Sequence, residues 1–194
     1  MRQLILKMSM SLDGFVSDLE GTNTWMFGSD PEAQAWSVEV TWNASLHIMG
    51  SRSFAAMAPF WPTSTMEFAP PMNQIPKAVF SRQGPAVLKA ASASKGVAGA
   101  QSWAEAYVAG GELTGEIAKL KAGDGKPILA HGGVSFARSL VAAGLIDQFV
   151  LAVHPIALGK GLRLFSELVA PMRLSLVSSR AFPGGAMAQI YRPA

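Results

Sequence analysis

Two short glycine-containing segments have the composition of a phosphate-binding site. Gly50-Ser51-Arg52-Ser53 and Gly132-Gly133-Val134-Ser135 each follow an apolar, strand-like run and precede a helix-like run. The first backbone N–H groups of a helix lack acceptors within the helix and lie at the positive end of its dipole, so they attract anions. Glycine allows a phosphate to come close to the main chain. Two such segments at neighbouring strand ends would hold the pyrophosphate of a dinucleotide between them.

Each glycine segment taken alone could simply make a tight connection, so the prediction depends on the pair. Arg52 and the dipeptide Ser81-Arg82 add guanidinium groups near the two segments. A guanidinium binds two phosphate oxygens at once. Residues 132–135 match neither the G-x-G-x-x-G dinucleotide fingerprint nor a Walker loop, so these two motifs are excluded as the source of phosphate binding.

Asp13 is the acid of greatest chemical interest, because it stands with Gly14 directly after the first apolar run. A carboxylate there could orient a substrate or supply a proton, although Asp-Gly pairs often form only a turn. The three histidines, His47, His131 and His154, are far apart in sequence, and each lies at or near a predicted strand end. Satisfied histidines of the core or its rim are favoured over ligands, and no metal site is predicted.

The composition excludes several classes of protein. The chain has 194 residues, 49% hydrophobic and 15% charged, which suits one folded domain over residues 1–194. The absence of cysteine excludes disulfides, thiolate nucleophiles and thiolate-bound zinc. A formal charge of +3 without a run of Lys or Arg argues against a nucleic-acid partner. The sequence shows neither a membrane-spanning run nor a signal peptide, so we expect a cytoplasmic protein.

Apolar periodicity predicts strands that are separated by helices. The predicted strands cover residues 4–10, 46–50, 77–81, 127–131, 148–154, 173–180 and 187–192. Helices are predicted from Pro31 onward, with Asp30 as the cap, and over residues 51–57, 112–121 and 134–143. Five prolines in residues 59–76 indicate a surface loop, and residues 86–109 carry no clear pattern. The order of elements predicts an α/β sandwich with a largely parallel sheet and a C-terminal antiparallel hairpin.

At these same segments the chain resembles the dihydrofolate-reductase-like family that includes the C-terminal reductase domain of the bifunctional riboflavin-biosynthesis deaminase-reductase. The resemblance covers nearly the whole length. It is carried by Met10-Ser11-Leu12-Asp13-Gly14-Phe15-Val16, Met49-Gly50-Ser51-Arg52-Ser53-Phe54, Lys77-Ala78-Val79-Phe80-Ser81-Arg82, Gly132-Gly133, Ala143-Gly144-Leu145-Ile146-Asp147 and His154-Pro155-Ile156-Ala157-Leu158-Gly159-Lys160-Gly161.

The resemblance implies a three-layer fold with a mixed, mainly parallel sheet and NADPH bound across the strand ends. Residues 50–53 would lie at the first helix start, Ser81 and Arg82 near the adenosine phosphate, and residues 132–135 at the pyrophosphate. The family's first helix start commonly reads Gly-Arg-x-Thr, whereas Ser51 stands here at the usual arginine position and Arg52 follows it. The zinc deaminase signature of the bifunctional enzyme requires cysteines, which this sequence does not contain.

The activity implied by the resemblance is NADPH-dependent reduction of a C=N or C=O group in a small heterocycle, similar to that of 5-amino-6-(5-phosphoribosylamino)uracil reductase. Asp13 is the candidate for substrate orientation or proton supply. Two alternatives stay open: a dihydrofolate-reductase-like pterin reductase, and a non-catalytic nucleotide-binding or dimeric scaffold protein of the same fold. The family often pairs through its sheet, so a homodimer is expected.

Overall fold

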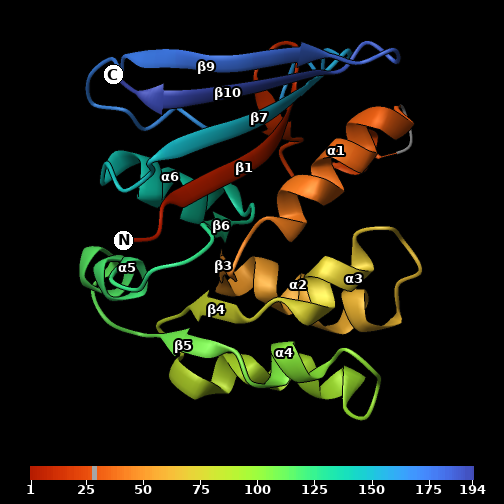
Figure 1. Ribbon diagram of the computed structural model, residues 1–194, viewed down its shortest axis with the longest axis vertical. Helices are drawn as coiled ribbons and strands as arrows, with labels where there is room; N and C mark the ends of the chain where they lie inside the picture. The colour runs from red at the N-terminus through yellow and green to blue at the C-terminus, as the bar shows by residue number, and fades with distance from the viewer. Residues whose placement is uncertain (28–29) are drawn as a thin grey trace.

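The computed structural model describes residues 1–27 and 30–194. Its centre is an eight-stranded sheet with the order β5-β4-β3-β6-β1-β7-β10-β9, which Figure 1 shows from β9 at the top to β5 at the bottom. The strands from β5 to β7 run parallel, and β10 is antiparallel to both of its neighbours. The bounds are β1 (Leu4–Ser11), β3 (Leu46–Gly50), β4 (Lys77–Phe80), β5 (Tyr107–Ala109), β6 (Ile128–Ala130), β7 (Gln148–His154), β9 (Leu174–Ala181) and β10 (Met187–Pro193).

Helices cover both faces of the sheet, so the molecule has three layers (Figure 1). The helices are α1 (Pro31–Trp42), α2 (Ser51–Phe60), α3 (Ala69–Gln74), α4 (Gln101–Ala104), α5 (Leu113–Lys121) and α6 (Val134–Ala142), with 3₁₀ segments η1 (Thr24–Met26), η2 (Trp61–Thr63) and η3 (Gly84–Ser94). On one face, Ile117 of α5 and Leu140 of α6 share a core cluster with Leu6 of β1. On the other, Trp36 of α1 packs against the cluster of Ile5. The alternation of Ile5 and Leu6 across the strand therefore fixes both layers.

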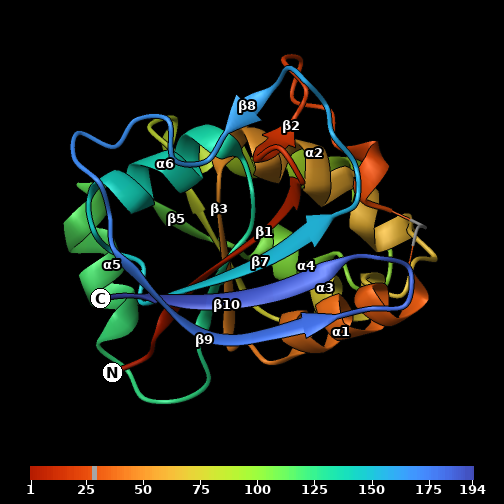
Figure 2. The ribbon, with the colours of Figure 1, turned by 90° about the horizontal axis from the view of Figure 1, so that it is seen from above.

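The predicted α/β fold is confirmed, including the largely parallel sheet and the terminal hairpin of β9 and β10. The structure also contains a second, two-stranded sheet, and its later strand was not predicted from the sequence. It pairs β2 (Phe15–Ser17) with β8 (Leu162–Arg163), and Figure 2 shows it beside α2 and α6. A two-residue strand leaves no periodicity to detect, and its pairing is set by residues about 145 positions earlier in the chain, which sequence spacing does not reveal.

The prediction of a surface loop over residues 59–76 is wrong. This segment contains the end of α2, all of η2 and all of α3, and it buries Trp61 and Met72 in a core cluster with Trp103. Pro59 lies in the last turn of α2 and Pro70 at the start of α3. A missing N–H costs little at the start of a helix, which accounts for Pro70, and Pro59 stands one residue before the end of α2. These prolines therefore mark helix boundaries and do not exclude helices.

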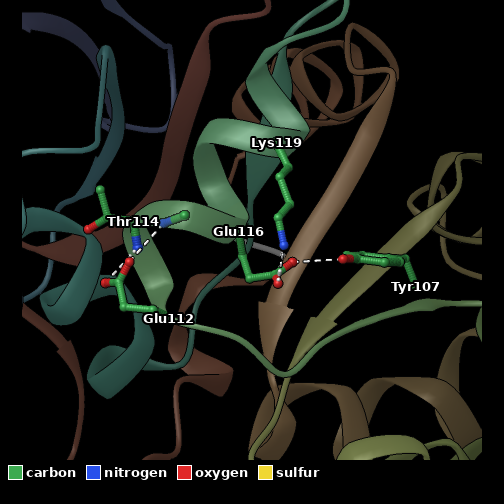
Figure 3. A network of polar contacts seen from close by, with 6 residues as sticks. Tyr107, Glu112, Thr114, Glu116 and Lys119 are labelled. Carbon is green, nitrogen blue, oxygen red and sulfur yellow. Dashed lines mark hydrogen bonds and ion pairs between the residues drawn. The ribbon is translucent and has the colours of Figure 1, made fainter.

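The short edge strand β5 is fastened to α5 by a polar cluster, which Figure 3 shows in detail. Tyr107 Oη donates a hydrogen bond to Glu116 Oε2 at 2.7 Å, and Lys119 Nζ donates to Glu116 Oε1 at 3.0 Å. Both bonds favour the ionised carboxylate and hold the pKa of Glu116 below its ordinary value. The cluster lies on the described edge opposite to β9, away from the sheet centre.

Candidate functional site

A cleft of about 780 Å³ opens at the carboxyl ends of the parallel strands. It is lined by both glycine segments of the sequence, here called the first glycine turn (residues 50–53) and the second glycine turn (residues 132–135). Strands β3 and β6 end at these turns and are parallel neighbours, with Ile48 paired with Ala130. Because parallel strands end at the same edge of a sheet, the two turns lie next to each other.

The two glycine turns are in direct contact. Ser53 Oγ donates a hydrogen bond to the Gly132 carbonyl oxygen at 2.8 Å. Gly133 has φ +96°, and a Cβ placed on it would lie 2.4 Å from Ser53 Oγ. A Cβ on Gly50 would lie 3.0 Å from Phe136 Cβ. Glycine is therefore required at Gly133 both by its backbone conformation and by the closeness of the neighbouring turn.

Both helices that start at the glycine turns have open N-terminal ends. Among the described residues, no side chain caps α2 or α6, and no acid lies in the first turn of either helix. Their first N–H groups therefore lack the side-chain acceptors that helix starts usually have. Two uncapped helix starts, held side by side at one cleft, form a positive surface for an anion with two phosphates.

The predicted cofactor residues line the cleft with one exception. Both glycine turns contribute all of their residues. Arg52, in the first turn of α2, and Arg82, two residues after β4, also line the cleft, and both side chains are exposed. Ser81 does not line the cleft. It is buried, and its hydroxyl oxygen accepts a hydrogen bond from the Gln83 N–H at 3.1 Å. The Ser81 side chain is thus used within a turn, so we do not carry it into the proposed site.

Asp13 lies beside the cleft and not in its lining. Its carboxylate accepts hydrogen bonds from Ser11 Oγ at 2.6 Å, from the Leu158 N–H at 3.1 Å and from the Gly159 N–H at 2.7 Å. The hydrogen bond from Ser11, together with those from the two backbone N–H groups, lowers the pKa of Asp13 to about 2. A carboxyl that is ionised throughout the neutral range has no proton to donate, so of the two predicted roles only orientation is carried forward.

Lys7 is a cleft residue that the sequence analysis missed. It lies in the middle of β1 with its Nζ 5.7 Å from the centroid of the Phe68 ring. Within residues 1–27 and 30–194 it forms neither an ion pair nor a hydrogen bond through its amine. Burial lowers the pKa of Lys7 to about 8. A lone lysine inside the apolar run Leu4–Met8 was the available signal, because such a residue is costly to bury without a partner.

Two histidines also reach the cleft with unused ring nitrogens. His154, at the end of β7, has both Nδ1 and Nε2 buried without a partner in the described part of the chain, and its ring packs edge-on against Trp25 at 5.6 Å. His131 packs edge-on against His47 with ring centroids 4.5 Å apart, and its Nε2 is likewise buried and unpartnered. Burial lowers the pKa of both cleft histidines, so both rings are neutral at pH 7.

A family model described as the RibD C-terminal domain matches residues 2–188. The chain belongs to this family. The resemblance drawn from the sequence motifs is thereby confirmed.

Other proteins resemble this RibD C-terminal domain in sequence or in fold. The protein YyaP of Bacillus subtilis (strain 168) is 26% identical over 98% of this chain and 94% of its own. A structure from Shewanella sp. PV-4, ascribed to riboflavin biosynthesis, has a TM-score of 0.74 and 22% identity over 99% of both chains. The diaminohydroxyphosphoribosylaminopyrimidine deaminase/5-amino-6-(5-phosphoribosylamino)uracil reductase of Thermotoga maritima has a TM-score of 0.69 and 16% identity, with 57% of its chain covered.

Two further properties of this RibD C-terminal domain bear on its chemistry. No helix of the described residues is long and apolar enough to cross a membrane. In the same residues, no group of three or more His, Asp or Glu side chains gathers as ligands for a metal ion would. The cleft is lined by the backbone of the glycine turns, the two rim arginines, Lys7 and the neutral histidines, together with the carboxylates of Glu20 and Asp30.

Proposed function

We propose that this RibD C-terminal domain binds NADPH across its two glycine turns and reduces a C=N or C=O group of a small heterocyclic substrate. The observation that carries the proposal is the pair of uncapped helix starts joined by the Ser53–Gly132 hydrogen bond. A pyrophosphate is the anion that matches two such ends at once. The Thermotoga maritima protein, which shares this fold, is named as a reductase, and this supports a reductase activity here.

The cleft can accept a phosphorylated dinucleotide at the positions that glycine occupies. A side chain at Gly133 would fill the space beside Ser53, so glycine keeps the main chain of the second glycine turn within reach of a phosphate. Arg52 and Arg82 stand exposed at the rim next to the first glycine turn, where they can bind a ribose 2′-phosphate. We therefore propose NADPH over NADH as the cofactor.

Lys7 would bind the substrate on the other side of the cleft. When bound, the nicotinamide supplies the hydride that converts the C=N or C=O carbon to a saturated centre. With a pKa of about 8, the Lys7 amine is mostly protonated at pH 7 and can donate a hydrogen bond or a proton to the substrate heteroatom. That contact would favour hydride addition by offsetting negative charge on the heteroatom.

Asp13 would act as a positioning residue. Its carboxylate joins the end of β1 to the backbone of Leu158 and Gly159, and this segment leads directly into β8. The β2–β8 sheet contributes Val16 and Leu162 to the cleft wall. Holding that wall in place would exclude water and align the reactants, which is the main task of a protein around a hydride donor.

The proposal is tested by titrating the protein with NADPH and with NADH while following nicotinamide fluorescence. We expect saturable binding of NADPH below about 1 mM, with NADH at least about tenfold weaker. Replacement of Arg82 by Ala would reduce this preference if Arg82 contacts the 2′-phosphate. Absence of binding by either cofactor would refute the proposal, and binding without oxidation by any imine or carbonyl substrate would favour the scaffold alternative.

We also propose a homodimer that forms along β9. This strand is the last of the sheet at that edge, and Leu176 and Val177 are about half exposed. A long exposed edge strand offers unpaired backbone groups to a second copy. Sedimentation of the 20.5 kDa chain at micromolar concentration tests this, and a monomer would contradict it.

A further inference from the structure

The cleft has two halves that differ in the number of positively charged side chains. One half lies between the glycine turns and near Arg52 and Arg82. The other, here called the substrate half, lies between the sheet and α1 and is lined by Lys7, Asp30, Ser37, Thr41, Phe68 and His154. If the cofactor occupies the first half, as proposed above, the second half must accept whatever is reduced.

The start of α1, which borders the substrate half, is capped by a carboxylate and therefore does not attract anions. Asp30 caps α1, because its Oδ1 accepts a hydrogen bond from the Ala33 N–H at 3.1 Å. Its Oδ2 accepts a second bond from the Gly184 N–H at 2.7 Å, and the carboxylate is buried. Glu32 adds a further acid in the first turn of the helix. A phosphate brought to this helix start would meet a carboxylate where α2 and α6 present free N–H groups.

The positive charge in the substrate half is small. Lys7 is the cation that lines this half among the described residues, and Asp30 and Glu20 line the cleft with negative charge. A phosphate monoester carries a charge of about −1.5 to −2 at neutral pH and is usually held by several donors or cations. One amine opposed by two carboxylates suits a single negative charge or a carbonyl oxygen.

The walls of the substrate half suit a flat ring. Trp61, Phe68 and Met72 line it and belong to one apolar cluster of the α2–α3 region. Trp61 Nε1 is buried and has no partner in the part of the chain that is described, and the same holds for both ring nitrogens of His154. Unpaired polar atoms in an apolar cleft indicate a ligand that brings its own hydrogen-bonding groups.

We infer that the substrate of this domain is an unphosphorylated, planar heterocycle with at most one anionic group, and that this group or a ring carbonyl binds Lys7 Nζ. This inference rests on the proposed function for the assignment of the two halves. It distinguishes the substrate of this chain from the phosphoribosyl compound in the name of the Thermotoga maritima protein. The substrate is thus recognised by one amine and the apolar walls, with no phosphate subsite of its own.

The test uses protein saturated with NADP⁺, so that the glycine turns are occupied. Thermal shift with NADP⁺ alone reports on the proposed function, and any further shift reports on the substrate half. The probes are ribose 5-phosphate, as a phosphate monoester without a planar heterocycle, and a panel of planar rings consisting of uracil, orotate and 6-carboxypterin. We expect at least one planar ring to raise Tm further and ribose 5-phosphate to cause no shift up to about 10 mM.

Two variants locate the binding. Lys7→Met should abolish the added shift from an anionic ring while raising the Tm of the unliganded protein, because the variant removes an unpaired buried charge. Asp30→Asn, which keeps a capping oxygen, should let ribose 5-phosphate bind measurably. The inference is overturned if ribose 5-phosphate shifts the wild-type NADP⁺ complex and Lys7→Met abolishes that shift, or if none of the planar rings binds.

Discussion

Among the α-helices of nine or more residues in the described part of the chain, the starts fall into two kinds. α1 and α5 begin with a carboxylate that binds their first N–H groups, Asp30 in α1 and Glu112 in α5. Glu112 accepts from the Thr114 and Gly115 N–H groups at 2.9 and 2.8 Å, as Figure 3 shows for the start of α5. α2 and α6 begin with glycine and have neither a side-chain cap nor a first-turn acid among the described residues.

We propose that the capped helix starts serve stability and that the uncapped starts of α2 and α6 serve ligand binding. A cap contributes about 1 kcal/mol, so a helix without one gives up stability that a single substitution could supply. Of these longer helices, the two uncapped ones start at the same cleft and are joined by a hydrogen bond, whereas the residues at the start of α5 do not line the cleft. Variants that add a carboxylate to an uncapped helix start, or remove the cap from a capped one, should therefore separate effects on ligand affinity from effects on stability.

Gly133→Ala is expected to have the largest effect. The added Cβ would lie 2.4 Å from Ser53 Oγ, so either Ser53 gives up its hydrogen bond to Gly132 or the second glycine turn moves away from the first. We expect NADPH affinity to fall about 100-fold, which corresponds to about 2.7 kcal/mol. Gly144→Ala is the matched control, since Gly144 also has a positive φ, +64°, but a Cβ there meets nothing within 4 Å. The control should lose stability by about 1 kcal/mol and keep its affinity, as measured by denaturant unfolding and NADPH titration. Equal affinities in the two variants would show that the contact between the turns does not matter for binding.

Ser51→Asp would place a carboxylate at the uncapped start of α2. A carboxylate in the first turn of α2 favours the helix but occupies the place of an anion. We expect NADPH to bind about tenfold more weakly while Tm rises slightly. Ser51→Asn is similar in size without the charge and should retain most of the affinity. If both variants bind NADPH as the wild type does, phosphate does not lie at this turn.

Asp13→Asn tests a carboxylate that binds backbone N–H groups outside a helix. The pKa of Asp13 is lowered to about 2 in the folded chain from an ordinary 3.8, so its stabilising effect is present above about pH 4 and is lost as the pH falls towards 2. The variant should unfold at a lower temperature than the wild type at pH 7, and the two curves should converge near pH 2. Asp124→Asn, at an almost fully exposed side chain, should follow the wild type throughout. A constant gap across the pH range would rule out this role of the carboxylate.

Glu112→Ala should have the smallest effect. It removes the cap of α5 outside the cleft lining, so Tm should fall by a few degrees while NADPH affinity stays unchanged. Glu112→Asp retains a capping carboxylate and should recover most of the loss. A weaker NADPH complex in Glu112→Ala would show that the stability of α5 is coupled to the cleft.

The sequence predicted those features that are encoded locally. The two glycine turns, the Asp30 cap and the hairpin depend on residues within a few positions of each other, and each was found at its predicted place. The partners of Asp13 lie 145 and 146 positions away, so its backbone contacts could not be read from spacing. Lys7 was missed because alternation assigns a face to a residue but does not show that this face opens into a cleft.

The hydrogen bond between Ser53 and Gly132 also holds the starts of α2 and α6 at a defined distance from each other. It joins the main chain of one glycine turn to the side chain of the other, so the spacing of the two helix starts is fixed before any ligand arrives. A diphosphate can bind both helix starts at once and loses translational freedom once, whereas two separate phosphates lose it twice. The chain should accordingly discriminate a diphosphate from equal amounts of free phosphate by far more than its charge alone would predict.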